Sequence, residues 1–253
     1  MTPLSLSVEG LTKSFGGLSV IRDLSFTVPA GSATALIGPN GAGKSTAFNL
    51  ITGVYRPDAG RIRLGGKDIT GTPSRRRIGL GIARNFQNIR LMPHLSVLEN
   101  LLVGQHVRAG GLIDLLTPYR LLPKHRWRAE ALAALAECGL ERHAAERVQG
   151  LPYGIRKRID VVRATLSRPG LLLLDEPAAG LNPTETQALH RHLDMLRARG
   201  MTLLIVEHDM HFVGRTCGHV VVLNFGEKIA EGSLAEVQRD PLVREAYLGG
   251  MAA

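Results

Sequence analysis

The sequence predicts an α/β fold built around a mostly parallel sheet. Three apolar runs, at residues 33–37, 171–174 and 201–206, have the length of strands. Continuous apolar runs are typical of strands that a parallel sheet buries on both faces. The first run leads through a glycine-rich segment into a helix-like segment, and strand, helix and strand alternate again from residue 171. This alternation predicts parallel strands with helices covering them.

Turn and capping signals place the other elements. Turn signals at Gly16-Gly17 and at residues 29–31 separate the early runs, and Ser96 with Glu99 forms a capping box. Asn182 and Pro183 mark another helix start. The strands predicted in addition are residues 4–8, 19–28, 61–64 and 82–86, with a terminal hairpin around Gly226 and a tail after it. The helices predicted are residues 46–51, 96–102, 127–138, 156–167 and 183–199.

Length and charge limit the class of protein. The 253 residues suffice for one large or two small domains, and 21% charged with 44% hydrophobic residues describe a globular chain. The net charge of +9 raises nucleic-acid binding as an alternative. Basic clusters at 75–77 and 156–158 have no interleaved aromatic residues, and aromatics are only 4%. We therefore predict no nucleic-acid partner, and attribute the charge to solvated faces that also attract phosphates or an anionic membrane.

The two cysteines and the lengths of the apolar segments indicate where in the cell the protein works. Cys138 and Cys217 have no metal-like spacing and fit a reducing compartment. The first residues show no signal-peptide pattern, and no segment reaches the roughly 18 apolar residues that a membrane span needs. Any work at a membrane would therefore require another subunit.

The glycine-rich segment matches the phosphate-loop pattern G-x-x-x-x-G-K-S. Its glycines let backbone N–H groups approach phosphate oxygens, Lys44 would supply a positive charge, and Ser45 would be a Mg²⁺ ligand. The alternative is a glycine turn with an incidental lysine, which the flanking strand and helix disfavour. The predicted nucleotide-binding residues are Gly38, Pro39, Asn40, Gly41, Ala42, Gly43, Lys44, Ser45 and, at the next helix position, Thr46.

Two acids end the second apolar run. Asp175 follows four leucines, and a carboxylate at the end of a buried strand is costly unless it serves a cation. We predict that Asp175 holds Mg²⁺ through water and that Glu176 polarises the attacking water as a general base. The alternative is an apolar strand that simply ends in acids.

With these motifs in this order, nearly the whole chain resembles the ATP-binding subunit of ABC transporters. The resemblance implies a P-loop ABC ATPase core with a mostly parallel sheet, an antiparallel N-terminal part and an inserted helical subdomain. The predicted domain is 1–253, with the helical subdomain at about 87–155 and a terminal hairpin and helical tail at about 225–253. It also implies ATP and Mg²⁺ as cofactors.

The resemblance assigns three further site residues. Phe15 matches the aromatic that stacks on adenine, although a half-buried core role is the alternative. Gln87 matches the glutamine that senses Mg²⁺ and the attacking water, where a solvated side chain is the alternative. His208 matches the histidine that contacts the γ-phosphate, and a structural histidine is the alternative.

The signature loop departs from the family pattern Leu-Ser-Gly-Gly-Gln. Here Pro152 replaces the serine and Ile155 a polar residue, so Gly154 and the N-terminus of the next helix remain to bind the partner's nucleotide. The lost hydrogen bond to a charged group is worth about 1.5–3 kcal/mol. Asn182 stands where many members have aspartate, and a helix cap and a dimer contact are comparable interpretations.

Several short patterns are similar to the branched-chain amino acid transport ATPases, and urea and short-amide importers share many of them. The patterns lie at residues 68–71, 81–84, 86–91, 98–100, 153–154, 178–183, 207–210, 223–226, 230–232 and 245–249. They indicate the group rather than the solute.

The resemblance implies a head-to-tail pair of subunits, identical or different, with two ATP molecules between them. Membrane permeases would dock on residues 87–107 and on an apolar insert near 112–122, and a periplasmic solute-binding protein would act indirectly. The location implied is peripheral, at the cytoplasmic face of the inner or plasma membrane. Three hypotheses remain: an importer ATPase, which we favour; a regulatory ATP-binding subunit with weak hydrolysis; and a ribosome- or DNA-directed ABC protein, which the single phosphate loop disfavours.

Overall fold

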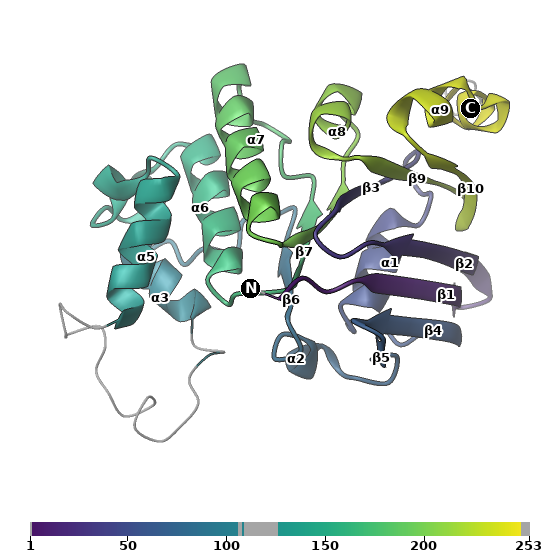
Figure 1. Ribbon diagram of the computed structural model, residues 1–253, viewed down its shortest axis with the longest axis horizontal. Coiled ribbons are helices and arrows are strands. Elements are labelled where there is room, and N and C mark those ends of the chain that lie inside the picture. The colour runs from purple at the N-terminus through teal and green to yellow at the C-terminus, as the bar shows by residue number, and fades with distance from the viewer. Residues whose placement is uncertain (1, 106–107, 109–125, 249–253) are drawn as a thin grey trace.

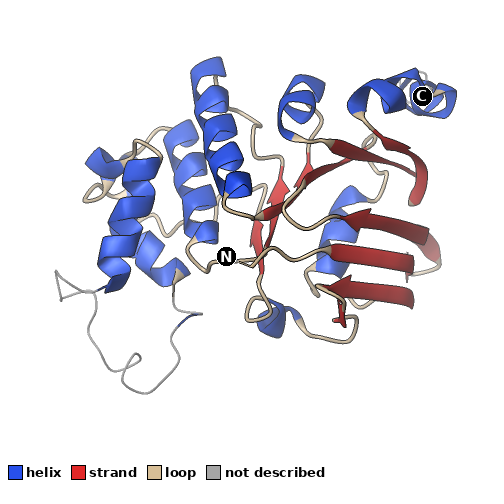
Figure 2. Ribbon diagram, in the orientation of Figure 1, coloured by secondary structure: helices blue, strands red, loops and turns tan. Residues whose placement is uncertain are grey.

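The computed structural model describes residues 2–105, 108 and 126–248, and these form two sheets with helices around them (Figure 1). Figure 2 shows helices on the left and along the top of the molecule and the strands on the right, with a helix between the two sheets. The predicted docking segment at 112–122 lies outside the described residues. None of the described helices is long and apolar enough to cross a membrane.

The smaller sheet is antiparallel and comes from the N-terminal part of the chain. Its strands are β1 (Leu6–Phe15), β2 (Leu18–Val28), β4 (Ala59–Leu64) and β5 (Lys67–Asp68), in the order β2-β1-β4-β5. β1 pairs antiparallel with β2 and β4, and its alternating buried positions face the core. The antiparallel N-terminal part that the resemblance implied is therefore present.

The larger sheet has the order β10-β9-β3-β8-β7-β6. Strands β6 to β9 and β3 run parallel, and only β10 pairs antiparallel, with β9. All five residues of β3, β7 and β8 are buried, as their continuous apolar runs predicted. The strands are β3 (Ala33–Ile37), β6 (Ile82–Asn85), β7 (Leu171–Asp175), β8 (Thr202–Val206), β9 (His219–Asn224) and β10 (Glu227–Gly232).

Side-chain alternation along the parallel strands builds two cores. On β7, Leu171 and Leu173 join the core that holds helix α1 (Lys44–Ile51) between the two sheets. Leu172 and Leu174 point to the opposite face and pack in the core with helices α7 (Pro183–Ala198) and α8 (Met210–Thr216). Figure 1 shows α1 between the sheets and α7 and α8 on the far face of the larger one. A helix carrying a phosphate loop is thus clamped on both sides.

A third core joins the helices beyond β6. α3 (Val97–Gly104), α5 (Arg126–Glu137) and α6 (Tyr153–Thr165) share buried residues that include Trp127 and Leu135. α3 begins at the predicted capping box, in which Ser96 Oγ accepts from the Glu99 N–H at 3.2 Å. These helices occupy the region expected for the helical subdomain, whose boundaries at 87 and 155 stay a prediction.

The structure differs from the sequence-based expectation in several short helices. α6 starts at Tyr153 rather than residue 156, with Pro152 as its N-cap residue. The sequence did not indicate this start because the first helical residues, Tyr and Gly, are weak helix formers. α8, with Asp209 as its cap, is only seven residues long and gives little periodicity. α2 (Ser74–Arg77) is also short, whereas α9 (Leu234–Arg239) and α10 (Pro241–Leu248) lie after the hairpin, where a helical tail was expected.

A buried histidine on α7 makes stability depend on pH. Burial lowers the pKa of His192 to about 4, and the nearby Arg158 acts in the same direction. As pH falls below about 6.5, the unfolded chain takes up a proton that the folded chain refuses, so the folded state loses stability. We expect the free energy of unfolding to fall by about 2 kcal/mol from this residue between pH 7 and pH 5. Measured by urea unfolding, the free energy of unfolding of His192→Leu should change less between pH 7 and pH 5 than that of the wild type. An equal change in both proteins would contradict the lowered pKa of His192.

Candidate functional site

The phosphate-loop motif occupies the turn between β3 and α1. Gly41 and Gly43 have φ values of +79° and +99°, which glycine adopts without strain. A Cβ on Gly38 would lie 2.1 Å from the carbonyl oxygen of Leu223, so only glycine fits there. The loop therefore has the strand–glycine–helix order and the tight backbone that a phosphate cradle needs.

Lys44, the first residue of α1, folds over this loop. Its Nζ donates to the carbonyl oxygens of Gly38 at 2.6 Å and Pro39 at 2.8 Å. Burial lowers the pKa of Lys44, while the negative charges of Glu176 and Asp175 act to raise it. The ammonium group is thus held on the loop, within electrostatic reach of the two acids.

The sheet order explains why these elements meet. β3, β8, β7 and β6 are parallel neighbours, so the residues that follow them emerge at one edge. Asp175 pairs with Val206 and Val206 with Leu36, which places Asp175 two strands, or about 10 Å, from the strand that enters the phosphate loop. The same edge carries Glu176 after β7, His208 after β8 and Gln87 after β6.

Glu176 is held by its backbone as well as by its side chain. Its φ of +47° is unusual for a residue with a Cβ and costs about 1 kcal/mol or more. Its N–H donates to Val206 O at 2.9 Å, and its carbonyl accepts from Lys157 Nζ at 2.6 Å. Gln87 Nε2 donates to Glu176 Oε2 at 2.9 Å, so the structure joins these two predicted residues.

His208 is placed at the same edge beside a buried acid. Its ring is largely exposed, with Nδ1 3.8 Å from Glu207 Oε2. Glu207 accepts backbone N–H bonds from Ala178 at 2.7 Å and from His208 at 3.2 Å, and burial raises its pKa. Glu207 therefore fixes the loop that carries His208 and leaves the imidazole open to a ligand.

Phe15 lies at the end of β1, on the antiparallel sheet. Its side chain is 40% exposed, packs edge-to-face on Tyr55 with ring centroids 5.1 Å apart, and has Lys13 Nζ 5.3 Å from the ring centre. This is a partly open aromatic surface rather than a core position. The adenine-stacking role of Phe15 stays a prediction, and Tyr55 is a neighbour that the sequence did not indicate.

Gly154 lies in the first turn of α6. A Cβ there would lie 2.1 Å from Glu185 Oε1, so a larger residue would displace the Glu185 side chain, which accepts from the N–H of the α7 cap residue. Asn182 is that cap, because its Oδ1 accepts from the Glu185 N–H at 2.9 Å. This supports the cap interpretation of Asn182, and its contact with a second subunit stays a prediction. Within the described part of the chain, Pro152 makes no side-chain hydrogen bond at the start of α6.

The donors around the loop suit a magnesium ion that is shared with phosphate. Ser45 and Asp175 offer hydroxyl and carboxylate oxygens, and Gln87 an amide oxygen. Over residues 2–105, 108 and 126–248, no group of three or more His, Cys, Asp or Glu side chains could hold a metal by itself. Mg²⁺ is commonly bound by one or two protein oxygens, waters and substrate phosphates, so the residues present fit this ion.

Two largely buried arginines hold elements of the site in place, and neither of them was identified from the sequence. Arg77 is 1% exposed and donates to the carbonyls of Leu50 at 2.8 Å and Ile51 at 2.6 Å, which stabilises the C-terminus of α1. Arg84, inside β6, forms an ion pair with Asp175 at 2.7 Å. The position of Arg84 within a predicted strand was the signal in the sequence that it has an acidic partner, because a charged side chain is rarely buried without one.

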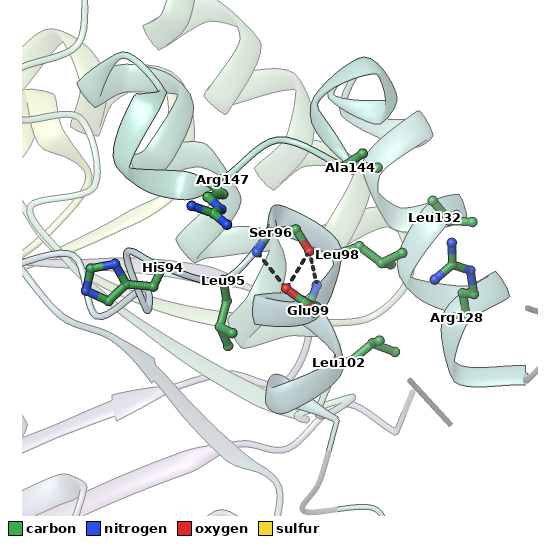
Figure 3. Close-up of a pocket in the computed structure, with 11 residues that line it drawn as sticks. His94, Leu95, Ser96, Leu98, Glu99, Leu102, Arg128, Leu132, Ala144 and Arg147 are labelled. Carbon is green, nitrogen blue, oxygen red and sulfur yellow. Dashed lines mark hydrogen bonds between the residues drawn. The ribbon is translucent and has the colours of Figure 1, made fainter. Parts of the chain in front are cut away.

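Of the cavities on the helical side of the site, two adjoin β6 and α3. One of about 270 Å³ is bordered by Arg77, Arg84, Phe86 and Arg163. The other, of about 540 Å³, surrounds the start of α3. Figure 3 shows its basic side chains, His94, Arg128 and Arg147, spread around the helix rather than directed at one point. The larger cavity therefore has no converging set of ligands.

Two models of known protein families match the chain. A family model described as ABC transporter matches residues 21–179, and one described as branched-chain amino acid ATP-binding cassette transporter matches residues 227–253. The sequence resemblance to the branched-chain group is thereby confirmed.

Individual relatives are similar over almost the full chain. The high-affinity branched-chain amino acid transport ATP-binding protein BraF of Pseudomonas aeruginosa is 40% identical over 248 residues, 96% of this chain and 97% of the relative. The Escherichia coli protein of the same description, LivG, is 38% identical with the same coverage.

Solved structures agree in the fold. The ADP conformation of an ATP-binding cassette of an ABC transporter has a TM-score of 0.86 at 33% identity, covering 98% of this chain and all of that one. A nucleotide-free cassette has a TM-score of 0.85 at 32% identity, covering 96% and 98%. The predicted ABC ATPase fold is confirmed. The chain therefore belongs to the ABC transporter family, as one of its ATPase subunits.

Proposed function

We propose that this ATPase subunit drives the import of branched-chain amino acids through separate membrane permeases. The carrying observation is the sheet edge at which the Lys44 loop, Asp175 and the bonded pair of Gln87 and Glu176 meet. The solute is supported by the printed names of relatives at 38–40% identity and by the match of the C-terminal residues 227–253.

The residues divide the chemistry of ATP hydrolysis between them. Lys44 and the N–H groups of the loop would bind the β- and γ-phosphates, and Ser45 and Asp175 would hold Mg²⁺, which supplies charge neutralisation when bound. Glu176 would accept the proton of the attacking water while Gln87 orients its carboxylate. His208 would donate to the γ-phosphate from the adjoining loop. Phe15 would support adenine on the antiparallel sheet.

The second nucleotide face would come from another ATPase subunit. Gly154 and the free N–H groups at the start of α6 would close over the partner's ATP in a head-to-tail pair. Lys157 of the same helix bonds the carbonyls of Glu176 at 2.6 Å and Ala179 at 2.7 Å, so α6 and the base-bearing loop would move together. Permeases would dock near residues 87–105, on the cytoplasmic face of the inner or plasma membrane, with a periplasmic binding protein delivering the solute.

Pro152 favours a second candidate, an ATP-binding subunit with weak hydrolysis of its own. A proline cannot supply the serine hydroxyl of the usual signature, and in the described residues nothing replaces it as a side-chain cap of α6. In this case the chain would pair with a different ATPase subunit, and that subunit would carry out most of the hydrolysis.

ATPase measurements on the reconstituted complex test the proposal. The chain, the permeases and solute-binding protein encoded beside it, and any second ATPase are placed in proteoliposomes, and phosphate release is followed with leucine, urea or acetamide. We expect leucine with its binding protein to stimulate turnover several-fold. Stimulation by urea or acetamide alone would contradict the amino-acid assignment, and activity that survives Glu176→Gln in this chain alone would identify it as the weakly hydrolysing subunit.

A further inference from the structure

We infer that Arg84 is a positioning residue that ties helix α1 to Asp175 and so sets the separation of the two proposed magnesium ligands. The inference rests on the proposed magnesium nucleotide site. It concerns a side chain that itself touches neither nucleotide nor ion in that proposal, and that acts through Asp175 and Asn49.

One guanidinium group makes both bonds. Arg84 Nη1 donates to Asn49 Oδ1 at 2.6 Å, and Nη2 donates to Asp175 Oδ2 at 2.7 Å. The Arg84 and Asp175 side chains are each 9% exposed, so water screens the pair little. Because a guanidinium is planar and its N–H groups have fixed directions, two simultaneous bonds fix the positions of both acceptors relative to each other.

The two acceptors lie on the elements that carry the proposed ligands. Asn49 is four residues after Ser45 on α1, so both side chains lie on the same face of the helix, one turn apart. Asp175 is the last residue of β7, and the bond from Arg84 engages only its Oδ2, which leaves Oδ1 for the ion's water shell. The arginine therefore links helix and strand without using all of the carboxylate.

Packing keeps the guanidinium where it is. It lies over the ring of Phe86, 4.7 Å from the centroid, and 5.5 Å from that of Phe48, a fully buried residue of α1. Phe86 precedes Gln87, and both Arg84 and Phe86 border the 270 Å³ cavity that residues of α2, α3 and α6 also line. A group that fills this cavity would press on the same side chain that holds Asp175.

Arg84 has two opposite effects on the affinity of the site for magnesium. The positive charge of Arg84 lowers the attraction of Asp175 for a cation, whereas its two bonds place the carboxylate correctly. Mg²⁺ demands nearly ideal octahedral geometry, and partners that orient a metal ligand typically change metal affinity about 10–100-fold. A buried carboxylate without its partner would also move to find another one. We therefore expect the positioning effect to exceed the charge effect.

The test measures how much Mg²⁺ strengthens ADP binding. Dissociation constants of a fluorescent ADP are determined in Mg²⁺ and in EDTA for the full-length chain, and their ratio is the magnesium gain. Arg84→Met should reduce this ratio about tenfold. Asn49→Ala, which keeps the ion pair but removes the bond to α1, should reduce it in the same direction. Arg90→Met is the matched control, since Arg90 also lies over Phe86, at 5.4 Å, and should leave the ratio unchanged.

The possible results of this titration distinguish the inference about Arg84 from the proposed magnesium site. An unchanged ratio in Arg84→Met and Asn49→Ala would overturn the inference, and a larger ratio in Arg84→Met would show that Arg84 only competes with the cation. If wild type itself shows no magnesium gain, the proposed magnesium site fails and the inference fails with it. Thermal unfolding checks each variant. Should Arg84→Met not fold, Arg84→Lys, which can reach only one of the two acceptors, replaces it, and the same reduction is expected.

Discussion

Replacing Glu176 by glutamine will leave ATP binding intact and lower turnover by at least about 100-fold, the range that a general base contributes. The amide keeps the shape of the side chain and can still bond Gln87, but it cannot accept a proton from water. Without hydrolysis, the paired subunits should stay closed on ATP. Phosphate release gives the rate, and size-exclusion chromatography with ATP and Mg²⁺ should show a larger fraction of dimer than wild type.

An exposed acid provides the control for this variant. Glu231→Gln makes the same change from carboxylate to amide on β10, where Glu231 pairs with Lys228 at 2.8 Å, and should keep wild-type turnover. Wild-type turnover in Glu176→Gln, measured without any second kind of ATPase subunit, would remove Glu176 from the role of base. Loss of nucleotide binding in that variant would instead indicate a structural role for its carboxylate.

Replacing Lys44 by alanine will raise the nucleotide dissociation constant at least about tenfold, because a hydrogen bond to a charged group is worth about 1.5–3 kcal/mol. The change also removes the bonds from Nζ to the carbonyls of Gly38 and Pro39, which brace the loop. A titration with fluorescent nucleotide measures the effect. Lys67→Ala, in an exposed position on β5, serves as control, and an unchanged affinity in Lys44→Ala would contradict the phosphate-loop assignment.

The central part of the fold could be predicted from sequence because its signals are local. β3, β7 and β8 are short apolar runs buried on both faces, and the glycines between β3 and α1 mark one motif within eight residues. Parallel strands end at one sheet edge, so acids at the end of β7 were expected near the phosphate loop. The influence of Asp175 and Glu176 on the pKa of Lys44 agrees with that expectation.

The contacts that fasten the site could not be predicted, because they join residues far apart in the chain. Arg84 and Asp175 are 91 positions apart and meet only because β6 lies beside β7. The bonds from Lys157 to the loop after β7 likewise depend on how α6 packs. A single sequence shows that a buried arginine or lysine needs a partner, but not which acceptor the fold supplies.

The short helices show another limit of sequence patterns. α8 and α9 have seven and six residues, too few for an apolar period to repeat convincingly. Their caps, Asp209 and Ser233, are visible in the sequence, but such residues are equally frequent in turns. Packing against the larger sheet, rather than local propensity, stabilises these helices.

The central claim is that the glycine loop and the acids after β7 bind one magnesium nucleotide together. A crystal structure with a nonhydrolysable ATP analogue and Mn²⁺ in place of Mg²⁺ tests it most directly, because anomalous scattering locates the metal. We predict a single peak about 2.1 Å from Ser45 Oγ, with Asp175 joined to it through water and Glu176 facing the γ-phosphate. A nucleotide in the loop with Asp175 and Glu176 too distant to share its metal would contradict the account.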